Sequence, residues 1–576
     1  MLSQQSKKDI KKKLNSIYKL NKIKKNLDIY ADEIFQLINN YNKFEKKIKT
    51  IKKIKISEKT SVLICYGDNL LNGNKKKTIK IFKKFYKKNL DNFFEIIHFL
   101  PFYPSSSDSG FAVKDHYQVD KKLGSWSDIQ LQSRNTNIMA DVVINHASSK
   151  GLWFKNFLSN KSPGKEYFLT VDKKFDISKV IRPRENRLLK KINIFKKNDF
   201  IWRTFSDDQI DLNFNNPKVL LRFIKIMLNL LYHGVTIFRL DAIAYLWKKS
   251  GSKCINLRET HEIIKLLRIV CNSLKTKPII VTETNLPEKE NLSYFGGKNN
   301  EANWIYNFSL PPLLVHSFLF EDSTYLNRWS KKLPSTKIGN NYLNFIASHD
   351  GIGMRPVEGY LNKKKLSKLF KRLKKNGGQL SYRKVQGSSK KVYEANITLF
   401  NAFKKTDYDK KGKFSVERYM SAHAIMIAFD GVPAIYFNSL FGTSNDELKY
   451  IISGNKRDLN RYKWNKKKLD SLLKDKSSKQ SIFYKQIVNL ISIKKKNKAL
   501  HPNAKRASIN MGKKIFCFKR TSLDKKQTLY CITNLTSKHL KFKFKNNISK
   551  YKNLLDETKI INQSLLKPFE TLWLSN

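Results

Sequence analysis

Eight short apolar runs, rich in Val, Ile and Phe, alternate with longer segments of helical periodicity. The runs cover residues 62–68, 94–102, 137–146, 235–244, 278–285, 304–311, 342–350 and 431–437. Strands that are buried on both faces and separated by helices form parallel sheets, and eight of them are typical of a closed barrel. We therefore predict an α/β fold, a (β/α)8 TIM barrel with inserted subdomains, an N-terminal helical extension and a C-terminal antiparallel β domain.

The segments around and between these runs follow other patterns. Apolar residues recur at helical spacing in 1–57, which predicts a helical extension packed on the barrel rather than a membrane-binding or partner-binding helix. We assign the barrel to 58–503, with insertions at about 147–211 and 351–414, because both connections exceed an ordinary loop. Short strand-like runs in 504–576 predict an antiparallel β domain.

Polar residues stand at the ends of the predicted strands, where a barrel of this kind has its active site. Three acids are prominent there, Asp241 in FRLDA, Glu283 in TETN and Asp350 in SHDG. Two carboxyls on either side of the anomeric carbon of a sugar allow double displacement, in which one attacks and the other protonates the leaving oxygen. Taken singly, each acid could instead cap a helix or pair with Arg239 or His349.

Together these segments resemble the α-amylase family of glycoside hydrolases and transglucosylases. ADVVINH, FRLDAIAY, TETN and FIASHDG match its four short motifs in order, and the resemblance extends over 60–576. It implies Asp241 as nucleophile, Glu283 as general acid/base and Asp350 as transition-state stabiliser. Other residues that this pattern places around a glucosyl unit are Arg239, which would orient the nucleophile, and His146 and His349, which would bind hydroxyl groups.

Longer segments resemble the sucrose phosphorylase branch of this family. They include HFLPFYPSSSDSGFAVKDHYQVD (98–120), SHDGIGMRPVEG (348–359) and GVPAIYFNSLFGTSND (431–446). On that pattern Asp108 and Arg461 clamp the far side of the glucosyl ring, and Phe111 and Tyr117 shape the pocket. Charged groups suit this task because charge-assisted hydrogen bonds orient sugar hydroxyls strongly.

Three features resemble the glucosylglycerate phosphorylases within that branch. These are the helical extension, the run SEKTSVLICYGD and the loop SDSGFAVKDHYQVD. The segment QLSYRKVQGSSKKVYEANI (379–397) resembles their acceptor-side loop, and we select Arg383 in it as a cation for an anionic acceptor. The loop ISGNKRDLNR (452–461) departs from the expected Glu-Thr-Gly-containing loop, and RKVQGSSKK is rich in lysine. Both departures concern the acceptor.

The resemblance implies a retaining phosphorylase. Phosphorolysis of an α-glucoside, best of 2-O-α-glucosylglycerate, would give α-glucose 1-phosphate through a covalent β-glucosyl-enzyme, with inorganic phosphate as co-substrate and no cofactor. Sucrose phosphorylase, sucrose 6-phosphate phosphorylase and α-glucoside hydrolase stay open as alternatives, because water and phosphate attack the same intermediate. A non-catalytic assembly subunit is disfavoured because all three acids are present.

Composition limits the partners and the compartment. The chain has 113 Lys and Arg against 47 Asp and Glu, a formal net charge of +66, which would attract phosphates without sequence preference. The lysines are spread along the chain, so we expect a solvated surface and neither nucleic acid nor membrane as partner. Five cysteines without CxxC spacing predict no disulfide framework or metal site and fit a cytoplasmic location without a secretion signal. A homodimer is left open.

Overall fold

The centre of the molecule is a closed parallel barrel. The computed structural model describes residues 4–19, 26–47, 54–73, 77–194, 197–385, 388–543, 551–557 and 563–576. Its barrel strands are β1 (Val62–Cys65), β3 (Ile96–Phe99), β4 (Asn137–Val143), β10 (Val235–Asp241), β11 (Ile279–Thr282), β12 (Trp304–Tyr306), β13 (Asn341–Asn344) and β17 (Val432–Tyr436). The spatial order is β1-β17-β13-β12-β11-β10-β4-β3, and β1 closes the ring by pairing with β3 and β17 in parallel. Each strand overlaps one predicted run, so the predicted barrel is confirmed.

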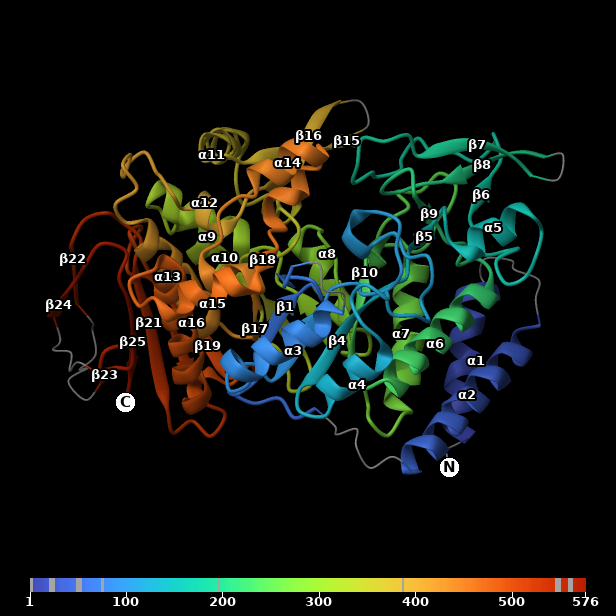
Figure 1. Cartoon of the computed structure of the whole chain (residues 1–576), viewed down its shortest axis with the longest axis horizontal. Coiled ribbons are helices and arrows are strands. Elements are labelled where there is room, and N and C mark those ends of the chain that lie inside the picture. The colour runs from blue at the N-terminus through green and yellow to red at the C-terminus, as the bar shows by residue number, and fades with distance from the viewer. Residues whose placement is uncertain are drawn as a thin grey trace.

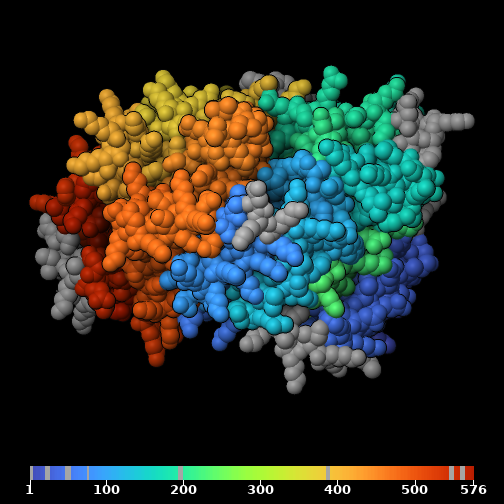
Figure 2. All heavy atoms as spheres, viewed as in Figure 1, coloured from blue at the N-terminus to red at the C-terminus, as the bar shows by residue number. Residues whose placement is uncertain are grey.

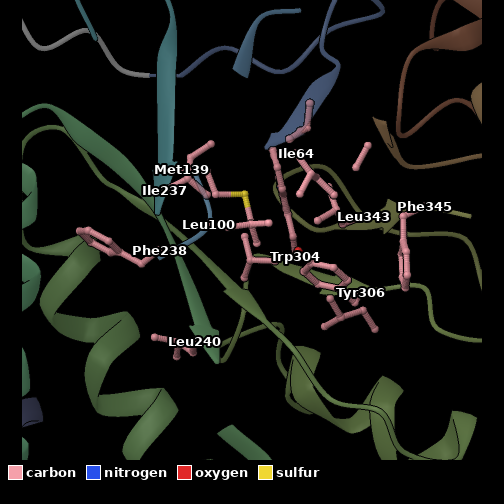
Figure 3. Packing of buried hydrophobic residues seen from close by; sticks show 14 of the residues in the cluster. Ile64, Leu100, Met139, Ile237, Phe238, Leu240, Trp304, Tyr306, Leu343 and Phe345 are labelled. Carbon is pink, nitrogen blue, oxygen red and sulfur yellow. The ribbon is translucent and has the colours of Figure 1, made fainter. Parts of the chain in front are cut away.

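Alternation along β10 decides which side chains reach the interior. Ile237 packs with Met139 among the buried side chains between the strands, whereas Phe238 points to the opposite side of β10 (Figure 3). Because side chains alternate with a period of two residues, Arg239 and Asp241 share the inner face with Ile237. Asp241 is the last residue of the strand and so lies at the end of the barrel interior.

Helices surround the barrel (Figure 1). They are α3 (Thr78–Asn89), α4 (Trp126–Ser133), α6 (Pro217–Tyr232), α7 (Arg258–Asn272), α8 (Glu288–Leu292), α9 (Leu310–Phe320), α10 (Thr324–Lys332), α13 (Ser415–Ala428) and α16 (Lys479–Lys496). The start of α6 follows from its sequence, since the Asn216 side chain accepts a hydrogen bond from the Lys218 N–H and Pro217 occupies the first turn.

The N-terminal extension consists of α1 (Gln4–Tyr18) and α2 (Leu27–Lys47), which pack on α7 and α6. Ile10, Leu14 and Ile17 of α1 are buried. Lys13 donates to Glu262 of α7 at 2.7 Å, which adds an ion pair to the apolar contact. The apolar face of α1 is thus covered within this chain.

Two insertions follow β4 and β13. The first contains β5 (His146–Ser148), α5 (Leu152–Leu158), β6 (Thr170–Val171), β7 (Leu189–Ile194), β8 (Lys197–Trp202) and β9 (Gln209–Asp211), and the second contains β14 (Ile352–Gly353), α11 (Lys363–Lys375), β15 (Gln379–Val385), β16 (Ser388–Asn396) and α12 (Leu399–Ala402). Both lie along the upper side of the molecule in Figure 1. They meet there, since Lys390 forms an ion pair with Glu185 at 2.6 Å.

The last part of the chain is an antiparallel β domain, as predicted. Its main sheet has the order β19-β20-β21-β25-β23, with β22 and β24 paired beside it. The bounds are β19 (Lys505–Ile509), β20 (Ile515–Thr521), β21 (Thr528–Asn534), β22 (Leu540–Lys543), β23 (Lys552–Asn553), β24 (Gln563–Leu566) and β25 (Thr571–Ser575). Figure 2 shows this domain and the N-terminal helices at opposite ends of the molecule. None of the helices described here is long and apolar enough to cross a lipid bilayer.

Candidate active site

A cavity lies where the barrel strands end. The predicted residues that line it are Asp108, Phe111, His146, Asp241, Glu283, His349 and Asp350. Arg239 and Arg461 lie directly behind this wall, each bonded to a lining carboxylate.

Asp241 is held by a series of buried charges. Arg239 Nη1 donates to Asp241 Oδ1 at 2.7 Å and also to Asp141. Asp141 in turn bonds His98 Nε2 through its other oxygen at 2.8 Å. All these side chains are within the barrel and almost wholly buried. The orientation of the Asp241 carboxylate is therefore fixed from beneath, and its free oxygen faces the cavity.

Glu283 follows β11 and lies beside Asp241. The Ala242 N–H donates to Glu283 Oε2 at 3.0 Å, and Glu283 Oε1 is 4.0 Å from Arg239 Nη2. Burial raises the pKa of both carboxyls, and Arg239 opposes that rise in each. Arg239 contacts Asp241 at 2.7 Å and approaches Glu283 only to 4.0 Å, so the two carboxyls stand in different electrostatic surroundings. Carboxyls that differ in this way can take different roles in one reaction, one as nucleophile and the other as proton donor.

Asp350 and Asp108 are two further acids of the cavity wall. Arg457 Nη1 lies 2.8 Å from Asp350 Oδ1, and Arg461 Nη1 lies 3.2 Å from Asp108 Oδ1. Burial raises the pKa of each acid, but Arg457 and Arg461 outweigh it, so both pKa values fall below their ordinary range. Both acids are anions at neutral pH and accept hydrogen bonds, as sugar hydroxyls require.

The two histidines are neutral donors or acceptors. The His349 ring stacks on Phe111, with centroids 5.1 Å apart and an interplanar angle of 7°. His146 Nε2 lies 3.0 Å from the Phe111 carbonyl oxygen and 3.0 Å from Gln209 Nε2. Burial lowers the pKa of both imidazoles, that of His349 far below its usual value. Neutral imidazoles can bind hydroxyl groups without adding charge to the cavity.

A buried lysine supports the segment that carries His146. Lys248 Nζ lies 2.5 Å from Asp211 Oδ2 and donates to Asn145 Oδ1 at 2.9 Å. Asn145 also donates to Asp211 at 3.0 Å, and Asp211 pairs with His146 across β5 and β9. Within the described ranges, no group of three or more His, Cys, Asp or Glu side chains is arranged to hold a metal ion.

The two remaining predicted residues, Tyr117 and Arg383, also do not line the cavity. Tyr117 has its phenol within hydrogen-bonding reach of Arg222, and its carbonyl accepts from Trp126 Nε1 at 2.9 Å. Arg383 is buried and bonds Glu358 at 2.7 Å, so its charge is already matched. A role for Arg383 toward the acceptor stays a prediction.

Sequence reasoning missed several residues of the cavity wall. They are Arg184, Phe205, Gln209, Tyr245, Asn285, Tyr393 and Arg457. Two of them could have been predicted from their spacing to predicted site residues. Arg457 precedes Arg461 by one helical turn, and Tyr245 follows Asp241 by four residues. Arg184, Phe205, Gln209 and Tyr393 come from the two insertions, whose path the sequence pattern did not predict.

Comparisons with known proteins agree with this geometry. Residues 85–371 match the family described as alpha amylase, catalytic domain. The chain is 33% identical over 569 residues to a glucosylglycerate phosphorylase of Escherichia coli, which covers 96% of this chain and 100% of the relative. It is 36% identical over 448 residues to a glucosylglycerate phosphorylase of Allomeiothermus silvanus, covering 78% and 80%.

A solved structure supports the fold. The crystal structure of sucrose 6F-phosphate phosphorylase from Thermoanaerobacter thermosaccharolyticum matches with a TM-score of 0.73 and 22% identity, covering 89% of this chain and 99% of that one. At this identity the likeness concerns the fold. The sequence matches and the barrel together lead to one conclusion: the chain belongs to the α-amylase family, in the branch that contains the glucosylglycerate phosphorylases.

Proposed function

We propose that this protein is a retaining phosphorylase that converts 2-O-α-glucosylglycerate and phosphate into α-glucose 1-phosphate and glycerate, reversibly. One observation carries the proposal: Asp241, Glu283 and Asp350 line a single cavity at the end of the barrel, with Arg239 bonded to the proposed nucleophile. The choice of glycerate rests on the glucosylglycerate phosphorylases that match most of the chain.

The first step forms a covalent intermediate. The Asp241 carboxylate attacks the anomeric carbon of the α-glucosyl unit while the bond to the acceptor oxygen breaks. Glu283 gives its proton to that oxygen, so glycerate leaves as its free hydroxy acid anion. The product is a β-glucosyl ester of Asp241, and Glu283 is left ionised beside it.

The second step restores the α configuration. A phosphate oxygen attacks the anomeric carbon from the face that glycerate left, the ester bond to Asp241 breaks, and Glu283 accepts the proton from phosphate. Asp350 and Asp108 hold the ring hydroxyls, and the charge of Asp350 favours the cation-like sugar of both transition states. Two inversions give net retention, and neither step uses a cofactor.

A product assay tests the proposal. Purified protein is incubated with 2-O-α-glucosylglycerate, sucrose or sucrose 6-phosphate, each with and without phosphate, and glucose and glucose 1-phosphate are measured. We expect phosphate-dependent glucose 1-phosphate, formed fastest from glucosylglycerate. Glucose released at the same rate without phosphate would instead identify an α-glucoside hydrolase.

The remaining partner and location predictions have separate support. All five cysteines are free and buried, which favours a reducing compartment such as the cytoplasm. Exposed lysines occur on α1, on α3, on α11 and in the turn after β20, so the positive charge is not gathered on one element. This distribution favours a solvated surface over a nucleic-acid-binding face. A homodimer stays a prediction, which the molar mass in solution would test.

A further inference from the structure

Arg355 is a buried cation without an anionic partner among the residues that the structure describes. The residue is 4% exposed, and its Nε and Nη1 are buried without a hydrogen-bond partner. An unpaired charge in the interior is costly, so proteins rarely keep one without a use. This arginine therefore requires an explanation.

In the other buried arginines of this structure, a carboxylate or several main-chain carbonyl oxygens compensate the positive charge. Arginines that bond a carboxylate are Arg203 with Asp207, Arg239 with Asp241, Arg383 with Glu358, Arg418 with Asp409, Arg461 with Asp108 and Arg506 with Asp430. Arg520 bonds three main-chain carbonyl oxygens instead. Arg355 differs from all of these.

The segment that carries Arg355 runs along the cavity wall. The Met354 N–H donates to the Tyr393 carbonyl oxygen at 2.9 Å. A side chain at Gly353 would come within 2.8 Å of Asn285 Oδ1, so these two residues are in close contact. Tyr393 and Asn285 both line the cavity. Arg355 therefore begins its short 3-10 helix beside the wall that these residues form.

Arg355 acts electrostatically on a residue of the cavity wall, Tyr245. Tyr245 lines the cavity, and burial raises the pKa of that phenol. Arg355 and Arg184 oppose the rise in pKa, Arg355 the more strongly. Arg184 itself lies over the Tyr393 ring, 5.1 Å from its centroid. Arg184 is thus in contact with Tyr393, and Arg355, behind the lining residues, is close enough to act on Tyr245.

We propose that Arg355 binds the carboxylate of the acceptor, and so selects glucosides of a small hydroxy acid over glucosides of a neutral polyol. The proposal rests on the proposed function, because it assigns a role in the same cavity. A guanidinium offers paired N–H donors whose geometry matches a carboxylate. Since Arg355 is already buried, an incoming anion gains the interaction without a further cost of desolvating the arginine.

The other cations near the cavity are less suited to this role. Arg457 is committed to Asp350 and to Glu394, which it bonds at 3.0 Å. Arg383 is committed to Glu358. Arg184 lines the cavity but is partly exposed, so water competes with any anion it binds. Arg355 is the buried cation beside this wall whose charge is unmatched by the described residues.

The test uses α-glucosyl fluoride as donor, so it needs no phosphate. Transfer of glucose to D-glycerate or to glycerol is measured for the wild type, for Arg355→Met and for Arg355→Lys. In Arg355→Met we expect the KM for D-glycerate to rise at least about tenfold, the loss of one charged hydrogen-bond partner. The KM for glycerol and the hydrolysis of the fluoride should change less than about twofold. Arg355→Lys should recover part of the loss.

Two further readouts separate binding from structure. Arg355→Met should unfold at the same temperature as the wild type or higher, because it removes an unpaired buried charge. Arg372→Met, on α11, removes an arginine bonded to Asp407 and should leave both acceptors unaffected. Equal losses for D-glycerate and glycerol in Arg355→Met would overturn the proposal, as would a wild type that transfers no glucose to D-glycerate. Transfer to D-glycerate without any phosphorolysis would uphold Arg355 and refute the proposed function.

Discussion

The cavity has two sides that differ in how their charges are matched. On the side proposed to hold glucose, the glucose side, Asp241, Asp350 and Asp108 are each paired with an arginine. On the side proposed to hold the acceptor, the acceptor side near Tyr245 and Tyr393, Arg355 and Arg184 have no carboxylate partner among the described residues.

This difference indicates how each side works. Paired charges hold one another in place, so the glucose side is organised before substrate arrives, and its hydrogen bonds cost little reorganisation. The charge of an unpaired cation is not compensated within the protein, so an anion, either an acid acceptor or phosphate, can bind there. The glucose side therefore determines the chemistry, and the acceptor side determines which molecules exchange the glucosyl group. The following variants are ordered by the size of the effect that this division predicts.

Asp241→Asn should have the largest effect. It keeps the side-chain volume and an oxygen for Arg239, but it removes the nucleophile, so phosphorolysis should fall by at least about 10⁴-fold. Circular dichroism and thermal unfolding should remain those of the wild type. The control is Asp470→Asn, which loses a surface carboxylate bonded to Lys466 in α15 (Lys466–Lys474) and should retain full activity. Turnover near the wild-type rate in Asp241→Asn would show that Asp241 is not the nucleophile.

Glu283→Gln should have an effect that depends on the leaving group. Glycerate leaves poorly without a proton, so kcat/KM for glucosylglycerate should fall about 10²- to 10⁴-fold. Fluoride needs no proton to leave, so the burst of fluoride released when the glucosyl-enzyme forms should persist. The amide oxygen of the substituted side chain can still accept from the Ala242 N–H, so folding should be preserved. Equal losses for both donors would contradict a role as acid.

The sequence predicted the glucose side far better than the acceptor side, and barrel geometry explains why. Asp241 ends a buried strand and Glu283 follows another. Parallel strands of one barrel all end at the same opening, so a local sequence pattern is enough to predict that these distant residues come together. Arg184 and Tyr393 come from insertions that meet only through tertiary contacts such as Lys390 with Glu185. No local periodicity in the sequence predicts that the two insertions contact each other.

The same limit applies to Arg383. The sequence indicated an acceptor-side loop around this arginine, and the loop does border the cavity, since Tyr393 of β16 lines it. Arg383 lies on β15 and bonds Glu358 at 2.7 Å. Which basic residue pairs with a carboxylate depends on where each carboxylate lies in the fold, and the sequence alone does not show this.

Arg457→Met tests whether charge matching on the glucose side matters for the reaction. The variant loses the closest cation to Asp350, so kcat/KM should fall about 10- to 100-fold, the effect of one lost buried ion pair. Arg457 lowers the pKa of Asp350. Its removal should therefore raise that pKa and move the acidic limb of the pH–rate profile to higher pH.

A second variant separates this effect from a structural one. Arg457 also bonds Glu394, which is buried, so Arg457→Met leaves that acid unpaired and should lower stability as well. Glu394→Gln breaks the same ion pair but keeps Arg457 on Asp350. We expect Glu394→Gln to retain the wild-type pH profile. If its profile shifts as far as that of Arg457→Met, the pairing with Asp350 is not the cause.

Arg184→Met should have the smallest effect, because Arg184 is partly exposed and its charge is screened. We expect kcat/KM for phosphate and for glucosylglycerate to fall about three- to tenfold at low ionic strength, and the difference from the wild type to shrink as salt is added. Arg184→Lys keeps the charge but loses the planar stacking on Tyr393, so it distinguishes attraction of anions from support of the ring. Rates near wild type in Arg184→Lys would show that charge alone matters. A loss in Arg184→Met that is as large at high salt as at low salt would contradict screening and make Arg184, like Arg355, a desolvated contact of the acceptor side.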